Sequence, residues 1–141
     1  MWTTGVNRDQ PEKVFIQIKN GYSTASMTVG QIASLSTTVA DGITCTRPAT
    51  ANLAAVKGVV TAASIAYGEY GEAQCYGYNA GCLVSGGTDV TAGAKLSAKD
   101  AVFNAIAAAG TLVAGESGVI IAMEAFTTST AAAKKVELRL M

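Results

Sequence analysis

The amino-acid sequence predicts a mainly β protein: a compact small barrel or sandwich of short strands, with at most one or two short helices. About nine or ten short segments of β-branched or alternating residues recur at roughly eight- to twelve-residue spacing, with turn residues between them. The 141 residues are half apolar and only 14% charged, with ten acidic and ten basic side chains. A chain of this length and composition forms one domain and is not intrinsically disordered.

The N-terminal part is expected to form an arm and a first strand. Residues Met1 to Pro11 are polar and irregular. Lys13–Lys19 is the clearest strand, since β-branched and aromatic residues lie between two lysines. The Asn20-Gly21 pair that follows is a strong turn signal. We therefore divide the chain into residues 1–20, an extended N-terminal arm with the first strand, and residues 21–141, a single β-rich domain.

The next segments are expected to alternate between short strands and turns. In residues 26–36, apolar residues three apart suit a helix, but serine, threonine and glycine favour an irregular strand. The elements predicted after this strand are a turn at Ala40–Gly42, a strand at Ile43–Thr46, one helical turn at Ala49–Ala55, a buried strand at Lys57–Ala62 and a tight loop at Tyr67–Gly71.

The C-terminal half is predicted to be mostly strands. Residues Lys99–Ala109 are rich in alanine, which favours a helix, but flanking glycines favour a strand and a loop, so both structures stay open. The other elements predicted are strands at Glu72–Tyr78, Gly81–Ser85 and Ala94–Ser97, a hairpin loop at Gly115–Gly118 after Thr111–Ala114, a central strand at Gly118–Phe126, and a half-exposed strand at Lys135–Leu140.

The residue inventory argues against catalysis. The chain has no histidine, which removes the commonest general base and the commonest zinc ligand. Cys45, Cys75 and Cys82 are an odd number of thiols without zinc-site spacing, so we expect three small buried cysteines. We predict neither a cofactor nor a metal, and we predict that the protein is not an enzyme.

Charge and hydropathy restrict the partners further. A net charge of zero lacks the electrostatic footprint of a nucleic-acid-binding protein. The longest uncharged apolar stretch is far short of the ~20 residues that cross a bilayer, and residues near Met1 are polar where a secretory leader is apolar. We therefore expect no nucleic acid and no membrane as partner, and synthesis in the cytoplasm. The remaining classes of function are physical ones: adhesion, assembly or reinforcement.

Two features indicate a protein partner. Strand edges are normally protected by lysine and proline, and this chain has few of either, so we expect its edges to be covered by other chains. Four tyrosines also cluster in the sequence, and such a cluster suits a subunit interface or stacking on a sugar. These candidate interface residues are Tyr67, Tyr70, Tyr76 and Tyr78.

Several short motifs in the sequence together match a known pattern. They are Lys57–Val60, Tyr76-Gly77, Gly81–Val84, the Val-x-x-Gly-small-x-Leu turn at Val90–Leu96, the Gly-hydrophobic-Ala-Met-Glu-Ala strand at Gly118–Ala125, and the closing strand at Lys135–Leu140. These motifs resemble those of the small capsid decoration, or cement, proteins of tailed bacteriophages. The similarity extends over roughly residues 55 to 141, and the first 50 residues match only as a polar arm that leads into a strand.

The resemblance implies a fold akin to the β-tulip of the lambda-type head decoration protein. Such proteins bind the outer surface of the expanded head and stabilise contacts between major capsid protein subunits, often as homotrimers, with a dimer as the alternative. An N-terminal arm in related proteins commonly adds to a capsid strand. The matching segment in this sequence would be Val14, Phe15, Ile16, Gln17 and Ile18.

Two other classes of function stay open at this point. One is a different virion structural protein, such as a tail-tube or head–tail connector protein, although the candidate hairpins are short for a tube subunit. The other is a carbohydrate-binding adhesion module that uses the region from Tyr67 to Tyr78.

Overall fold

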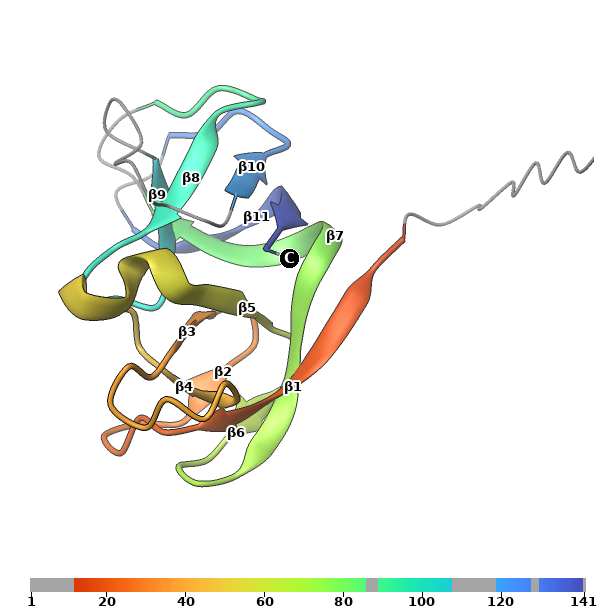
Figure 1. Cartoon of the computed structure of the whole chain (residues 1–141). Coiled ribbons are helices and arrows are strands. Elements are labelled where there is room, and N and C mark those ends of the chain that lie inside the picture. Colours follow the sequence, from red (N-terminus) through yellow and green to blue (C-terminus); the bar gives the residue numbers. More distant parts are fainter. Residues whose placement is uncertain (1–11, 86–88, 108–118, 128–129, 141) are drawn as a thin grey trace, which may run out of the picture.

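One long strand organises the molecule. The computed structural model describes residues 12–85, 89–107, 119–127 and 130–140. In it, the 16-residue strand β7 (Tyr70–Ser85) pairs with β1, β5, β9 and β11. Figure 1 shows β7 passing from a lower group of strands to an upper group. The predicted mainly β class is confirmed: the described residues form eleven strands and one 3-10 helix, η1 (Thr50–Ala55).

The lower strands form a closed ring, which we call the N-terminal ring. Its order is β1-β4-β3-β5-β7, and β1 returns to pair with β7. The β1–β4 pair is parallel and the others are antiparallel. A separate two-stranded sheet, β2–β6, lies beside this ring. The strands are β1 (Val14–Asn20), β2 (Met27–Thr28), β3 (Ile32–Leu35), β4 (Thr44–Thr46), β5 (Val56–Val60) and β6 (Ser64–Ile65).

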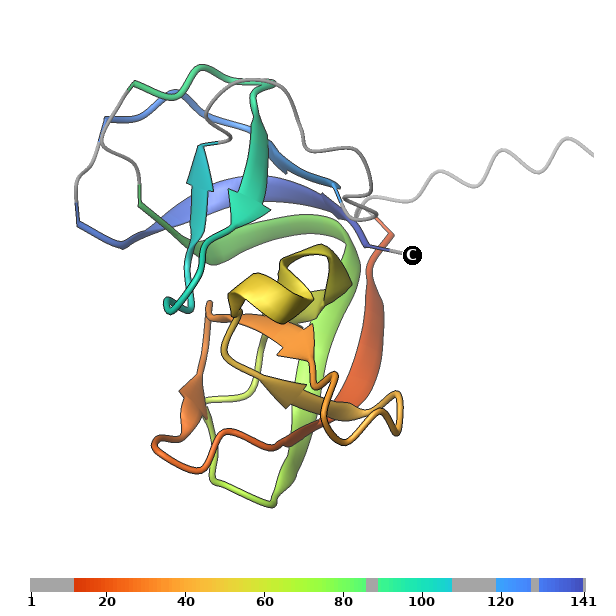
Figure 2. The same cartoon turned by 60° about the vertical axis from the view of Figure 1, so that its left-hand side comes forward.

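The upper strands form a second ring with the same plan, the C-terminal ring. Its order is β7-β11-β10-β8-β9, and β9 closes it by pairing in parallel with β7. Figure 2 shows the two rings above and below η1. Its strands besides β7 are β8 (Lys95–Ala98), β9 (Ala105–Ala107), β10 (Val119–Ala122) and β11 (Ala132–Arg139).

Each ring has its own apolar core, and β3 and β5 contribute to both. Along β3, Ile32 packs with the upper core and Ala33 with the lower one; along β5, Val59 and Val60 divide in the same way. This follows from the alternation of side chains along a strand, which places neighbours on opposite faces. The two strands therefore form a common wall between the rings.

The loop between β8 and β9 also joins the rings. The carbonyl of Phe103 accepts a hydrogen bond from the N–H of Ile32 at 2.7 Å, and the Phe103 ring packs edge-on against Tyr22. Asp100 Oδ1 accepts a bond from the N–H of Thr50 at 2.7 Å. Of the two structures left open for Lys99–Ala109, the described residues, through Ala107, adopt the loop and strand. The tertiary contacts of Phe103 overrule the helical preference of alanine.

The prediction of separate strands at Glu72–Tyr78 and Gly81–Ser85 was wrong, because β7 is continuous. Side-chain amides replace the backbone bonds that the bend of β7 disrupts. Gln74 Nε2 donates to the carbonyls of Tyr76 and Tyr78 at 3.0 Å each, and Asn79 Nδ2 donates to Gln74 Oε1 at 3.1 Å. Gly77 lies within the bend at a φ of +90°, a region that favours glycine.

Two other boundaries differ from the prediction. In the hydrophobic segment predicted as one strand, Gly118–Phe126, the described residues from 119 on form only the four-residue strand β10, which lies between β11 and β8, whereas Phe126 forms an isolated bridge with Val90. Asn20-Gly21 does not form a hairpin turn. Asn20 ends β1 as a buried residue, and the turn falls at Ser23-Thr24. Burial in the ring thus overrides the local turn preference.

Some predicted elements lie outside the described residues: the arm Met1–Pro11, the segment Thr111–Ala114 and the hairpin loop Gly115–Gly118. The predictions at Lys13–Lys19, Ile43–Thr46, Ala49–Ala55, Lys57–Ala62, Ala94–Ser97 and Lys135–Leu140 are confirmed as β1, β4, η1, β5, β8 and β11, within a few residues at the ends. Among the described helices, none has the length and apolar character needed to cross a membrane.

Candidate interaction surface

The outer edge of β1 is only partly used by the N-terminal ring. The N–H of Asn20 donates to Glu69 on the β7 side, and the N–H of Lys19 donates to Ile43 on the β4 side, both at 2.9 Å. Because successive backbone groups alternate between the two edges of a strand, those of Phe15 and Gln17 face the β4 side. The pairing with β4 covers only Lys19 and Asn20. No described strand pairs with this side at Phe15 and Gln17.

The exposed ring of Phe15 projects from β1 beside two hollows, both of which lie on the side where β1 pairs with β7. Phe15 is 45% exposed and lines both of them. One hollow, of about 370 Å³, is lined by Ile16, Gln17, Gly71 and Glu72 as well as Phe15. The other, of about 320 Å³, includes Val29, which is 57% exposed, beside Phe15. Hollows beside an exposed phenylalanine suit the side chains of another protein.

A fixed loop flanks the same edge. Ile43, whose carbonyl bonds to Lys19, and Val39 are exposed apolar residues in the turn before β4. Asp41 holds this turn, because its carboxylate accepts bonds from the N–H of Ile43 at 3.0 Å and from the N–H and hydroxyl of Thr44 at 2.7 and 2.6 Å. The hydroxyl of Thr44 is the main reason why the pKa of Asp41 lies below its ordinary value.

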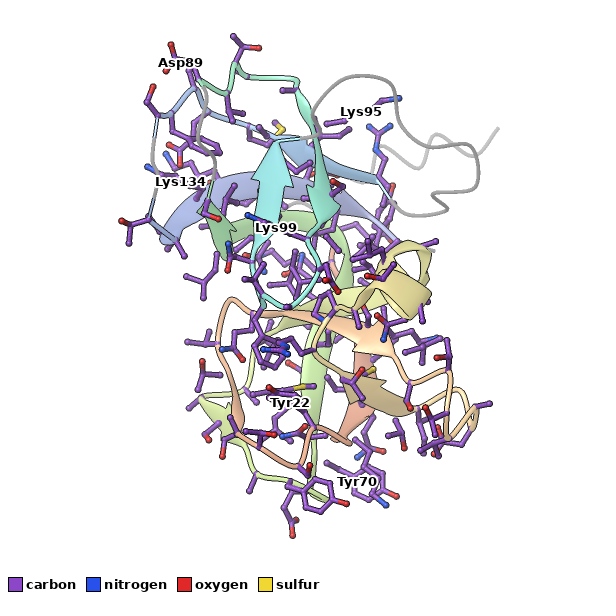
Figure 3. All side chains as sticks on the ribbon, turned by 90° about the vertical axis from the view of Figure 1, so that its left-hand side faces the viewer. Tyr22, Tyr70, Asp89, Lys95, Lys99 and Lys134 are labelled. Atoms are coloured by element: carbon purple, nitrogen blue, oxygen red, sulfur yellow. The ribbon has the colours of Figure 1, made fainter. Side chains whose placement is uncertain are left out.

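The structure separates the four candidate tyrosines into two pairs. Tyr67 and Tyr70 are 62% and 53% exposed and lie in the β6–β7 turn and at the start of β7. Figure 3 shows Tyr70 at the lower end of the molecule. Tyr76 and Tyr78 are half-buried farther along β7, opposite Arg139 and Glu137 of β11. Eight residues of extended strand span up to roughly 26 Å, so the two pairs lie at different places on the molecule.

The residue that positions Tyr67 and Tyr70 is Asn20, which was not among the predicted site residues. Asn20 is fully buried, and its Nδ2 donates to the carbonyl of Ile65 at 2.8 Å and to that of Ala25 at 3.2 Å. Its Oδ1 accepts the N–H of Tyr22 at 2.8 Å, and its own carbonyl accepts the N–H of Gly68 at 2.8 Å. An asparagine before glycine signals a turn, and nothing in the sequence distinguishes it from a buried asparagine that ties together distant turns.

The three cysteines are free and buried, as expected. Burial raises the pKa of the thiols of Cys45 and Cys82 to about 12, which keeps them protonated and unreactive at neutral pH. Burial also raises the pKa of Cys75, whose Sγ lies 3.5 Å from the carbonyl of Val14. Among the described residues, no three acidic or cysteine side chains gather as metal ligands.

The arrangement of strands has a counterpart among solved structures. It aligns with the crystal structure of the head fiber gp8.5 N base in bacteriophage phi29 at a TM-score of 0.52 and 13% sequence identity. The alignment covers 91% of this chain and 95% of that one, so the likeness extends over both rings and shows a shared fold. No family model matches the chain, and no curated protein matches its sequence.

Proposed function

We propose that this protein is a non-enzymatic structural component of a bacteriophage head. Two observations from different sources support this. The fold is shared, over nearly the whole of both chains, with the base of a phage head fiber. The motifs between residues 55 and 141 resemble those of phage decoration proteins. A chain that lacks histidine and has buried, protonated thiols also fits a structural role better than a catalytic one.

Within that role, we propose a capsid decoration protein. It would bind the outer surface of the expanded head, as a homotrimer, and stabilise contacts between major capsid protein subunits. The half-buried Tyr76 and Tyr78 are then the candidates for contacts between protomers. The division into an arm with the first strand, residues 1–20, and a domain, residues 21–141, remains part of this proposal, with β1 contributing to the ring as well.

The open edge of β1 carries the proposal. Its unpaired backbone groups can accept an extended segment of the major capsid protein by strand addition, and the exposed ring of Phe15 can pack against a side chain of that segment. In this proposal Val14–Ile18 stays paired with β7 in the N-terminal ring and makes the predicted capsid contact through the outer edge of β1.

The test is binding to heads assembled from the major capsid protein that the same genome encodes. We expect the purified protein to co-sediment with expanded heads and not with unexpanded ones. Gln17→Pro removes only the outward N–H, which an edge strand tolerates, and we expect at least a tenfold loss of binding. Gln17→Ala keeps that N–H and should bind like the native chain.

The outcomes distinguish the alternatives. Equal binding of Gln17→Pro and Gln17→Ala, with native circular dichroism for both, would contradict strand addition at β1. Failure of the native chain to bind expanded heads would overturn the decoration role. Rings or tubes of the purified protein in electron micrographs would assign it to a tail tube or connector instead. Sedimentation velocity of the native chain and of Tyr76→Ala tests the trimer and its interface.

A further inference from the structure

The lower end of the molecule carries two exposed aromatic rings on a fixed turn, which we call the tyrosine tip (Tyr67–Tyr70). Gly68 adopts a φ of +82°, which permits the tight turn between the two tyrosines. The N–H of Gly68 donates to the carbonyl of Asn20 at 2.8 Å, and the carbonyl of Glu69 accepts the N–H of Asn20 at 2.9 Å. The N–H of Glu69 also donates to the carbonyl of Ala66 at 3.0 Å.

Few backbone groups at this tip are left to rearrange. The buried side chain of Asn20 fixes Ile65, immediately before the turn, and Ala25, in the neighbouring turn. Exposed tyrosines on a prearranged backbone bind with little loss of conformational entropy, since each ring has only two rotatable bonds. The tip is therefore built as a contact surface, and the fold does not use either ring in its cores.

The groups around the two rings are polar and nearly balanced in charge. The Glu69 side chain is exposed between them in the sequence, and Lys19 Nζ lies 5.7 Å from the centre of the Tyr70 ring. The adjacent turn, which Asn20 holds through Ala25, exposes the hydroxylated residues Ser23, Thr24 and Ser26. Figure 3 shows Tyr70 at the end of the molecule, away from the C-terminal ring.

We propose that the tyrosine tip binds a neutral oligosaccharide. The faces of Tyr67 and Tyr70 offer apolar surface to the C–H-rich faces of sugar rings, while the phenol hydroxyls, Glu69 and Lys19 supply acceptors and donors for sugar hydroxyls. A protein partner fits less well, because a specific interface buries about 800 Å² on each side, and this tip offers two large side chains with small polar neighbours.

A single convex tip of this size binds weakly, because it cannot enclose its ligand. Many identical copies on a head surface would raise the overall affinity for a repeating glycan through multivalency. This gain rests on the proposed function, whereas binding by the isolated protein does not. The two proposals can therefore fail independently.

The experiment measures glycan binding by the free protein and by the protein bound to heads. The free protein is titrated with N-acetylchitotetraose and with maltotetraose while the resonances of Tyr67 and Tyr70 are followed by NMR, and decorated heads are applied to an array of bacterial and host-cell glycans. We expect shifts confined to the tip with at least one of these glycans. Tyr67→Ala and Tyr70→Ala should each reduce binding about tenfold, whereas Tyr70→Trp should retain it.

The matched control is Phe15→Ala, which removes another exposed ring, from β1, and should leave glycan binding by the free protein unchanged while reducing head binding. Absence of binding to every glycan, by the free protein and by decorated heads, would overturn the proposal. So would tip variants that bind glycans normally. Loss of head binding or of trimers in Tyr67→Ala and Tyr70→Ala would instead identify the tip as a protein contact.

Discussion

The two rings have the same pairing plan and different interiors. Each consists of five strands with one parallel pair, and each includes part of β7. The C-terminal ring encloses aliphatic side chains such as Leu96, Ile120 and Leu138. In the N-terminal ring, apolar residues share the interior with buried polar ones such as Asn20, which bonds to the backbone of two turns, and the buried Asn52 of η1 donates to the carbonyl of Leu35 at the end of β3.

This difference shows two ways to close a small ring. Strand length does not distinguish the rings, because each includes a strand of three residues, β4 in the N-terminal ring and β9 in the C-terminal ring. In the C-terminal ring, burial of apolar area supplies the stability. The turns beside the N-terminal ring carry backbone groups that need other partners, such as the carbonyls of Ala25 and Ile65. Buried amide side chains provide these hydrogen-bond partners, and the apolar core is correspondingly smaller.

The largest effect is expected in the C-terminal ring. Leu138 is fully buried in β11, and Leu138→Ala should lower the free energy of unfolding by about 3 kcal/mol, because apolar contacts are lost and a cavity remains. Urea denaturation measures this change. The matched control is Val39→Ala at an exposed site, which should change stability by less than about 0.5 kcal/mol. Similar losses for both variants would contradict the assignment of the core.

In the N-terminal ring, the corresponding change is Asn20→Ala. It leaves the carbonyls of Ile65 and Ala25 and the N–H of Tyr22 without their partner, and we expect a loss of about 2 kcal/mol. Asn20→Asp keeps an acceptor for Tyr22 but no donor, and it should be destabilised as well. Denaturation of both variants tests this, and a loss below about 0.5 kcal/mol for each would show that Asn20 does not hold the turns.

A smaller effect of opposite sign is expected at Ser34. Its hydroxyl is the buried side-chain polar atom that has no hydrogen-bond partner among the described residues. Ser34→Ala removes an unsatisfied group, so stability should be unchanged or higher by up to about 1 kcal/mol. Ser36→Ala is the control, because the Ser36 hydroxyl accepts the N–H of Val39 at 3.2 Å and its loss should destabilise slightly. A clear loss of stability in Ser34→Ala would refute this account.

The smallest effect is expected in the stability of the fold at acidic pH. The pKa of Asp41 is lower in the folded chain than its ordinary value of 3.8, mainly because the Thr44 hydroxyl bonds to the carboxylate. The bonded carboxylate therefore stabilises the fold above pH 3.8, and this contribution is lost as the pH falls through the lower folded-state pKa. Melting temperatures of the native chain and Asp41→Asn should converge slightly between about pH 4 and pH 2. A constant difference over that interval would contradict the linkage.

The strands predicted correctly, β1, β4 and β5 in the N-terminal ring and β8 and β11 in the C-terminal ring, are those whose residues carry a local strand pattern. Lys135–Leu140 alternates regularly, and the structure has β11 there with Val136 and Leu138 buried. The role of Asn20 was not predictable, since it depends on a bond to Ile65, 45 residues along the chain, as well as on one to Ala25. The same limit applies to β7, where a break was predicted at a bend that Gln74 and Asn79 stabilise.

The candidate site was predictable in part. The exposed alternation of β1 follows from Lys13–Lys19, but the open length of its edge depends on where β4 stops, which no local pattern reveals. We had expected other chains to cover the strand edges. Ring closure instead pairs most strand edges within the chain, so little lysine or proline is needed to protect them. The separation of Tyr67 and Tyr70 from Tyr76 and Tyr78 follows from the continuity of β7 and could not be foreseen from two short strands.

The shared strand also determines when the protein can fold during synthesis. β1 cannot complete its pairing until residues 70–76 of β7 have left the ribosome, and the C-terminal ring needs β11, at residues 132–139, to pair with β7. Pairings between such distant segments form slowly, because the conformational entropy of the intervening chain is lost before the stabilising contacts form. The apolar residues of β1 are thus exposed while the rest is made, and we expect Lys13, before the strand, and Lys19, near its end, to limit aggregation during that interval.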